Sequence, residues 1–164
     1  MLTKLVIAVS VVAGLALATR LYMGRAAQDT LQPGEHVAIR ELHDPLPDNS
    51  FLVCPPDYCA ATAGPSPIFA LPADRLEHDW RQMLAREPGT VIVADEPAQH
   101  RLVVIQHTRL LRFPDIVTAE FVALDGDRSG VAVYSKSRYG SGDFGTNRRR
   151  VLAWLDRLRR QAGQ

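Results

Sequence analysis

The sequence contains little of what defines the familiar metalloproteins and nucleic-acid-binding proteins. It has only two cysteines, Cys54 and Cys59, and two thiolates would need two further ligands to hold a metal. The histidines show no paired ligand spacing, so we expect neither a metal nor any other cofactor; they lie at positions 36, 43, 78, 100 and 107. Lysine plus arginine is 19 and aspartate plus glutamate is 18, so no global charge favours nucleic acid, and we expect none as a partner.

Residues 135–150, SKSRYGSGDFGTNRRR, are the most unusual stretch, and three familiar interpretations of it fail. Gly140, Gly142 and Gly145 spell a G-x-G-x-x-G, but a dinucleotide site would also need a second parallel strand and an acidic residue about 20 residues further on, and the sequence after the motif offers neither. Asp143-Phe144-Gly145 matches the kinase metal motif, but no lysine-bearing strand or catalytic loop precedes it. The Gly-Lys-Ser/Thr of a P-loop is also absent.

A hydrolytic triad has no better support. No G-x-S-x-G elbow surrounds either of the two serines that would serve as nucleophile. The residues available for such a triad are Ser135, Ser137, His100, His107 and Asp115. Strand histidines are usually surface or core residues, so we assign no catalytic residue and favour a protein that is not an enzyme.

The glycine-rich stretch has two interpretations that survive. The glycines permit positive φ, and the start of the following helix offers N–H groups that hold an anion. In the favoured interpretation Asp143, Thr146 or Asn147 caps these groups internally and the arginines pair with Asp143. The alternative is an anion-binding site, whose candidate residues are Arg138, Gly140, Asp143, Gly145, Asn147, Arg148 and Arg150.

Two motifs give the chain a resemblance to a known family. The first follows the pattern S-R-x-G-x-x-D-x-G-x-N-R-x-R and comprises Ser137, Arg138, Gly140, Asp143, Gly145, Asn147, Arg148 and Arg150. The second, LRFPD, contributes Arg112, Phe113 and Asp115, which either fix a turn or bind a ligand. Over roughly residues 50–160 the chain resembles the bacterial family called domain of unknown function 1499. The resemblance implies no activity. The chain departs from the family's Asn-Pro-Asn-Cys-like segment with Cys54-Pro-Pro-Asp-Tyr-Cys59.

The N-terminus is a targeting element. Lys4 precedes an apolar run over residues 5–18, and apolar character resumes at residues 21–23. We expect an uncleaved membrane anchor over residues 1–24, with a cleaved signal peptide as the alternative. An even cysteine count beside such a segment predicts a Cys54–Cys59 disulfide. We therefore expect an inner-membrane protein whose domain faces the periplasm, or a periplasmic or secreted protein if the segment is cleaved.

The remaining sequence predicts one domain of the α+β class. Residues 25–50 are expected to be a linker, with a short strand at 37–39, and residues 51–164 form the domain. The pattern predicts helices at 72–87 and 146–161, a hairpin turn at 125–127, and strands at 90–95, 101–107, 118–124 and 131–137. Short connections favour a two-layer sandwich, in which two helices cover one face of an antiparallel sheet of about four strands.

The sequence supports two hypotheses for function. The first is a non-catalytic binding or structural module tethered to the membrane by its N-terminal segment. The second is an enzyme or carrier for a phosphorylated or carboxylated small molecule, which the arginines of residues 138–150 would grip. The expected partners are therefore the membrane and an anionic small molecule or lipid headgroup.

Overall fold

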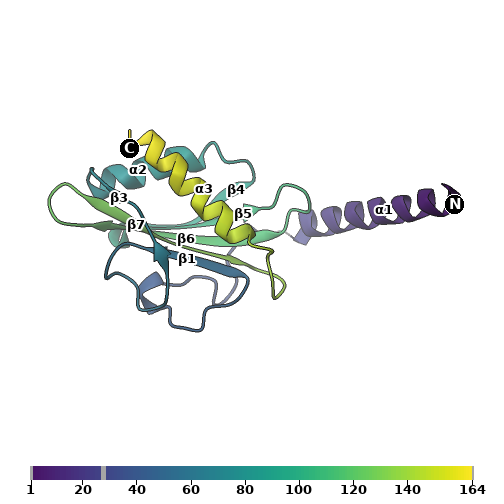
Figure 1. The fold of residues 1–164 in the computed structure, drawn as a ribbon, viewed down its shortest axis with the longest axis horizontal. Coiled ribbons are helices and arrows are strands. Elements are labelled where there is room, and N and C mark those ends of the chain that lie inside the picture. The colour runs from purple at the N-terminus through teal and green to yellow at the C-terminus, as the bar shows by residue number, and fades with distance from the viewer. Residues whose placement is uncertain (1, 27–28, 164) are drawn as a thin grey trace.

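A computed structural model describes residues 2–26 and 29–163, in which a long N-terminal helix leads into a domain of the α+β class (Figure 1). The helix α1 covers Leu2–Ala26. Its residues 5–22 have a mean hydropathy of 2.0 and are not covered by the rest of the chain, so length and composition allow the helix to cross a membrane or to act as a signal sequence. In Figure 1 it projects away from the domain.

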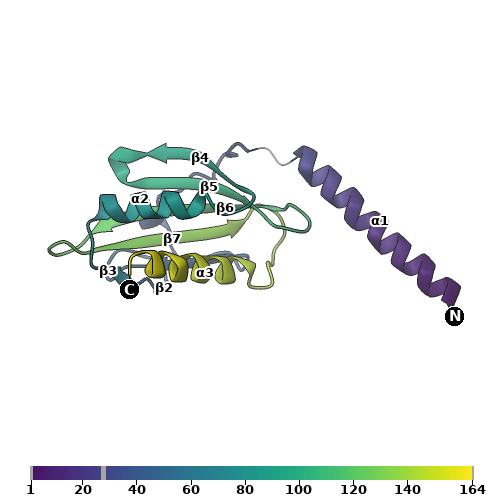
Figure 2. The same cartoon turned by 90° about the horizontal axis from the view of Figure 1, so that it is seen from above.

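Two amphipathic helices cover one face of the sheet (Figure 2). The helix α2 is Ala73–Leu84 and α3 is Thr146–Gln161. Both bury one apolar stripe, and the rings of Trp80 and Trp154 meet edge to face with centroids 5.7 Å apart. The predicted helices are thus confirmed, although α2 ends at Leu84, three residues before the predicted end.

The sheet is larger than predicted. Its seven strands are β1 Ser50–Cys54, β2 Gly64–Pro65, β3 Ile68–Phe69, β4 Thr90–Glu96, β5 Arg101–His107, β6 Pro114–Ala123 and β7 Ser129–Ser137. Their order is β2-β1-β7-β6-β5-β4, with β3 also paired to β7. The prediction of about four strands was wrong because β1 follows a proline-rich stretch and β2 and β3 are two residues each, too short to show a period of two.

The sheet is also mixed, which corrects the prediction of a purely antiparallel sheet. The four predicted strands do pair antiparallel with their neighbours, and β7 pairs antiparallel with β1. However, β1 and β2 run parallel, with Val53 opposite Gly64. A parallel pair needs a connection that crosses back over the sheet, and the loop after Cys54 provides it.

The second face of the sheet is covered by a segment that we call the strap, residues 29–47. Ile39 is fully buried and packs with Leu52, Ala132 and Tyr134. The backbone N–H of Ile39 donates to Glu120 Oε1 at 3.0 Å, and Glu120 also accepts from Tyr58 and Arg101. The predicted strand at 37–39 was wrong, because these residues lead into a short 3-10 helix, Ile39–Glu41. Part of the stretch expected to be a linker is thus packed on the domain.

Candidate functional site

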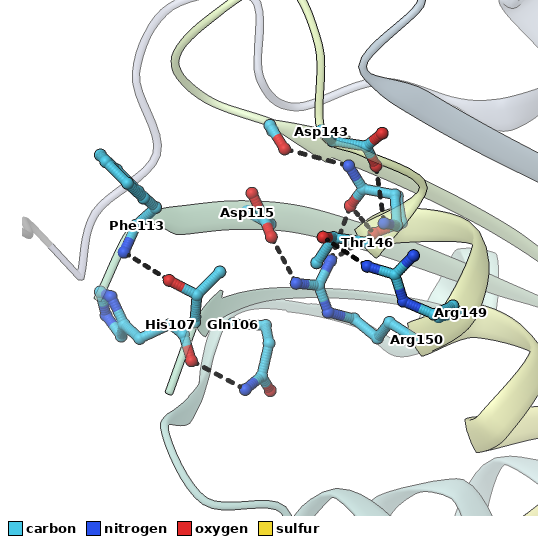
Figure 3. A network of polar contacts seen from close by, with 12 residues as sticks. Gln106, His107, Phe113, Asp115, Asp143, Thr146, Arg149 and Arg150 are labelled. Atoms are coloured by element: carbon cyan, nitrogen blue, oxygen red, sulfur yellow. Dashed lines mark hydrogen bonds and ion pairs between the residues drawn. The ribbon is translucent and has the colours of Figure 1, made fainter. Parts of the chain in front are cut away.

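The stretch rich in glycine and arginine, residues 135–150, folds where β7 ends and α3 begins (Figure 3). Asp143 lies just before α3, and its two carboxylate oxygens accept from the backbone N–H groups of Gly145 at 2.8 Å and Asn147 at 2.7 Å. Burial raises the pKa of the Asp143 carboxyl, but these two N–H donors outweigh it and hold that pKa below its usual range. The chain's own carboxylate therefore occupies the place where a helix N-terminus would hold an external anion.

Two glycines of this loop have a conformation that other residues avoid. Gly140 has φ +83° and Gly145 has φ +73°. A side chain at Gly140 would have room, so the requirement there comes from the backbone angle alone. At Gly145 a Cβ would also lie 3.3 Å from Arg149 Nη1. Gly142 has neither constraint.

Behind the loop lies a buried polar network centred on Asn147, which is fully buried. Its side-chain oxygen accepts from Ser135 at 2.6 Å and from Arg150 Nη1 at 2.6 Å. Its side-chain nitrogen donates to the Asn49 carbonyl at 2.9 Å and to Ser137 Oγ at 3.0 Å. Every hydrogen-bonding group of the Asn147 amide therefore has a partner, and the network joins α3 to β7 and to the start of β1.

The second motif meets the first within this network. Arg150 Nη2 pairs with Asp115 Oδ2, and the two side chains are 8% and 2% exposed (Figure 3). In the turn before β6, Arg112 has φ +57°, while the N–H of Phe113 donates to Thr108 Oγ1 at 2.9 Å. The motif thus divides into one residue of the network and two residues that shape a turn.

Asp143 was expected to pair with the arginines, but two of them pair with other carboxylates, Arg138 with Glu35 and Arg150 with Asp115. Arg138 donates to the Glu35 carboxylate of the strap from Nε at 2.6 Å and from Nη2 at 2.7 Å, and this hydrogen bonding raises the Arg138 pKa. Arg148 is exposed, with its guanidinium carbon 6.0 Å from the centre of the Phe51 ring. The structure therefore gathers the seven candidate residues at one end of the domain but does not converge their charges on one point.

The structure also shows the cysteines, the residues considered for a triad and the potential metal ligands. Cys54 and Cys59 form a disulfide with Cα atoms 6.1 Å apart. The residues considered for a triad bind other partners: Ser135 donates to Asn147, His100 faces Glu77, and His107 binds Asp29. Asp115 lies opposite Ser137 in the sheet, but its carboxylate pairs with Arg150. Among the described residues, no three histidine, cysteine, aspartate or glutamate side chains are grouped as metal ligands.

Sequence reasoning missed a cavity between the strap and the sheet, which we call the strap cavity. Its volume is about 420 Å³, and its walls include Val37, Leu42, Leu46, Ile116, Thr118, Tyr134 and Lys136. The Thr118 hydroxyl is buried and has no hydrogen-bond partner among the described residues. The alternation along β6 and β7 indicates that Thr118 and Lys136 share a face, but no pattern in the strap shows that it would cover them.

These features define a compact α+β domain, built on a mixed sheet and joined to an N-terminal apolar helix. Four residues of its two motifs, Asp115, Ser137, Asn147 and Arg150, belong to an internal polar network. Residues 48–158 match the family described as "Protein of unknown function (DUF1499)", which is more than half of the chain. The chain belongs to this family, as its two motifs indicate. No curated protein matches it.

Proposed function

We propose that this protein is a membrane-tethered, non-catalytic binding module whose domain faces the periplasm. Its ligand in this proposal is a small molecule with an apolar body and a carboxylate or phosphate, held in the strap cavity. The observation that carries the proposal is the contrast between the signature loop and this cavity. The charged groups of the loop are largely satisfied from within, whereas the cavity wall has a hydroxyl, of Thr118, and a cation, of Lys136, that lack partners among the described residues.

The dimensions and lining of the strap cavity suit such a ligand. Its volume of about 420 Å³ lies within the range of small-molecule sites. Val37, Leu42 and Ile116 offer apolar contact, and the aromatic ring of Tyr134 lines the same space. Sites of this kind combine mostly apolar walls with a few polar groups that fix the ligand's orientation.

Lys136 supplies the charge for an anionic group. It lines the cavity from β7, it is exposed, and its ammonium has no ion-pair partner within residues 2–26 and 29–163. The neighbouring Arg138 is committed to Glu35, so its charge is balanced. A carboxylate or phosphate in the cavity would therefore meet one uncompensated cation.

The way the two acidic residues of the motifs are used favours a non-catalytic role. Asp143 would be the natural general base of the loop, but both of its oxygens accept backbone hydrogen bonds and its pKa is lowered. Asp115 is buried against Arg150. A carboxylate held in its charged form by two fixed donors is a poor proton acceptor, and this favours a structural use.

The tether and the compartment rest on two further features. Helix α1 has the length and hydropathy of a membrane span. The domain carries a Cys54–Cys59 disulfide, and such bonds persist in oxidising compartments such as the bacterial periplasm. Together they favour a domain held at the outer side of the inner membrane.

The experiment is a thermal-shift titration of the full chain in detergent with hexanoate and phenyl phosphate. A probe at ten times its dissociation constant stabilises a protein by about 1.4 kcal/mol, which raises the Tm of a domain this size by roughly 3–6 °C. We expect Lys136→Ala to abolish the shift. Arg148→Ala, an exposed cation outside the cavity, is the matched control and should leave it unchanged.

Two outcomes would count against the strap cavity. The first is a shift in Lys136→Ala as large as in the wild-type protein. The second is a shift that Arg148→Ala abolishes, because the anion would then sit at the signature loop. In that case the enzyme or carrier hypothesis would gain the support that the cavity now has.

A further inference from the structure

Helix α1 joins the domain at one particular end of the sheet. Asp29, the first described residue after α1, binds His107 Nε2 at 2.9 Å, and His107 is the last residue of β5. Three peptide units separate Ala26 from Asp29 and span at most about 11 Å. In Figure 1 and Figure 2 the helix departs from this same end, opposite the β6–β7 hairpin.

Two loops project from this end, and we call them the anchor-side loops: residues 108–113 and residues 138–145. Each exposes a large apolar side chain. Leu110 is 74% exposed and Phe144 is 97% exposed. Between the loops lies a hollow of about 470 Å³, whose lining includes Leu111, Phe113 and Tyr139. An apolar surface of this kind, placed beside a membrane helix, is a candidate interaction site.

The loop around Phe144 is held in an uncommon conformation. Phe144 has φ +51°, a value that bulky residues rarely adopt. Arg149 Nη1 donates to the Phe144 carbonyl at 2.7 Å, and Asp143 fixes the neighbouring backbone. The backbone at Phe144 is therefore held in a strained conformation, and in that conformation the phenyl ring is exposed to solvent. Such strain is typical of positions where the arrangement serves a function.

Basic groups accompany the apolar ones. Arg109 is exposed beside Leu110, and Arg112 and Arg148 lie on or next to the two loops. Arg20 of α1 donates to the carbonyls of Leu110 at 3.0 Å and of Arg109 at 3.4 Å, so the helix and the first loop are in direct contact. Apolar side chains flanked by arginines are the composition that binds the headgroup region of anionic bilayers.

We propose that the anchor-side loops dock on the same bilayer that α1 spans, with Leu110 and Phe144 inserted into its interfacial region. The occupant of this surface is thus the lipid bilayer. The inference rests on the tether in the proposed function but is independent of the strap cavity. It implies that the domain lies against the membrane in one orientation, with the β6–β7 hairpin pointing away from it.

The test uses the full chain reconstituted in vesicles of phosphatidylethanolamine and phosphatidylglycerol, with lipids brominated near the headgroup end of their acyl chains. Phe144→Trp and Leu110→Trp place a fluorescent reporter on each loop. Ile68→Trp is the control, because Ile68 is 42% exposed and pairs with Gly130 at the hairpin end. Trp80 and Trp154 give the same buried background in all three variants.

We expect brominated lipid to quench the reporters at positions 110 and 144 several-fold more strongly than the reporter at 68. Equal quenching at the three positions, in protein that resists alkaline extraction from the vesicles, would overturn the docking while the tether stands. If alkaline extraction releases the chain, the tether and the docking fail together. Phe144→Asp supplies a second measurement, since it should reduce quenching of the reporter at position 110.

Discussion

Arg150 of α3 and Asp115 of β6 form an ion pair that is almost completely removed from solvent. Asn147 and Ser135 accept hydrogen bonds from the same guanidinium, at 2.6 and 3.0 Å. These two charged residues of the family motifs therefore hold helix α3 against the sheet.

Breaking that pair should be costly. Asp115→Ala or Arg150→Ala leaves one buried charge without its partner, and we expect each to lower the free energy of unfolding by about 3–5 kcal/mol. The double variant Asp115→Ala/Arg150→Ala should cost clearly less than the sum. Chemical denaturation of the full chain in detergent measures all three. The control is Arg159→Ala, an exposed residue, for which we expect a change within about 0.5 kcal/mol. If the losses in free energy of unfolding of the two single variants simply added up in the double variant, the result would contradict an interaction between Asp115 and Arg150.

Asp143 should contribute as a helix cap whose strength depends on pH. We expect Asp143→Ala to cost about 1–2 kcal/mol, and Asp143→Asn to cost less because it keeps one acceptor oxygen. The folded-state pKa is lowered, so the contribution is present above the unfolded value of about 3.9 and is lost as the pH falls through the folded value. Unfolding curves at neutral and acid pH check this. A difference between wild type and Asp143→Asn that grew in acid would contradict it.

Replacing the glycines of the loop by alanine should cost stability only where the backbone φ is positive. Gly140→Ala and Gly145→Ala force a side chain into a left-handed conformation, and we expect each to cost about 1–2 kcal/mol. Gly142→Ala is the matched control, since it has neither a positive φ nor a close neighbour, and it should change stability by under about 0.5 kcal/mol. Equal midpoints for the three variants in denaturant would mean that the loop relaxes freely.

Thr118 should behave in the opposite way to most buried residues. Its hydroxyl is buried without a partner among the described residues, so Thr118→Val should raise the free energy of unfolding by about 1 kcal/mol. Ser135→Ala provides the contrast, because the Ser135 hydroxyl donates to Asn147 and its loss should destabilise by a similar amount. Denaturation midpoints compare the two. A destabilised Thr118→Val would show that the hydroxyl finds a partner in solution.

The disulfide gives a test of the compartment. If the domain faces the periplasm, Cys54 and Cys59 should resist a thiol-alkylating reagent in protein taken rapidly from cells, and should react once reduced. Mass spectrometry of the 54–59 peptide counts the alkylated thiols. Free thiols before reduction would argue for a cytoplasmic domain, and a reporter fused to the C-terminus would check that result independently.

The sequence predicted the elements whose pattern is local. The apolar stripes of α2 and α3 and the alternation along β4 to β7 each extend over several periods, so these elements were recognised. Strand β1 and the strap were not, because their burial depends on contacts with β7 and β6. Asp143 as a cap was expected from its neighbours, whereas the pairing of Arg138 with Glu35 joins residues 103 positions apart. No periodicity encodes a contact of that range.

The strap has a consequence for how the family domain is defined. The family match begins at residue 48, whereas the strap ends at residue 47. A fragment cut at the start of the match would leave Leu52, Ala132 and Tyr134 without Ile39 above them, and would leave Arg138 without Glu35. Such a fragment would expose an apolar face of the sheet to solvent, and exposed apolar surfaces of this kind promote self-association. The strap, residues 29–47, is therefore part of the unit that folds.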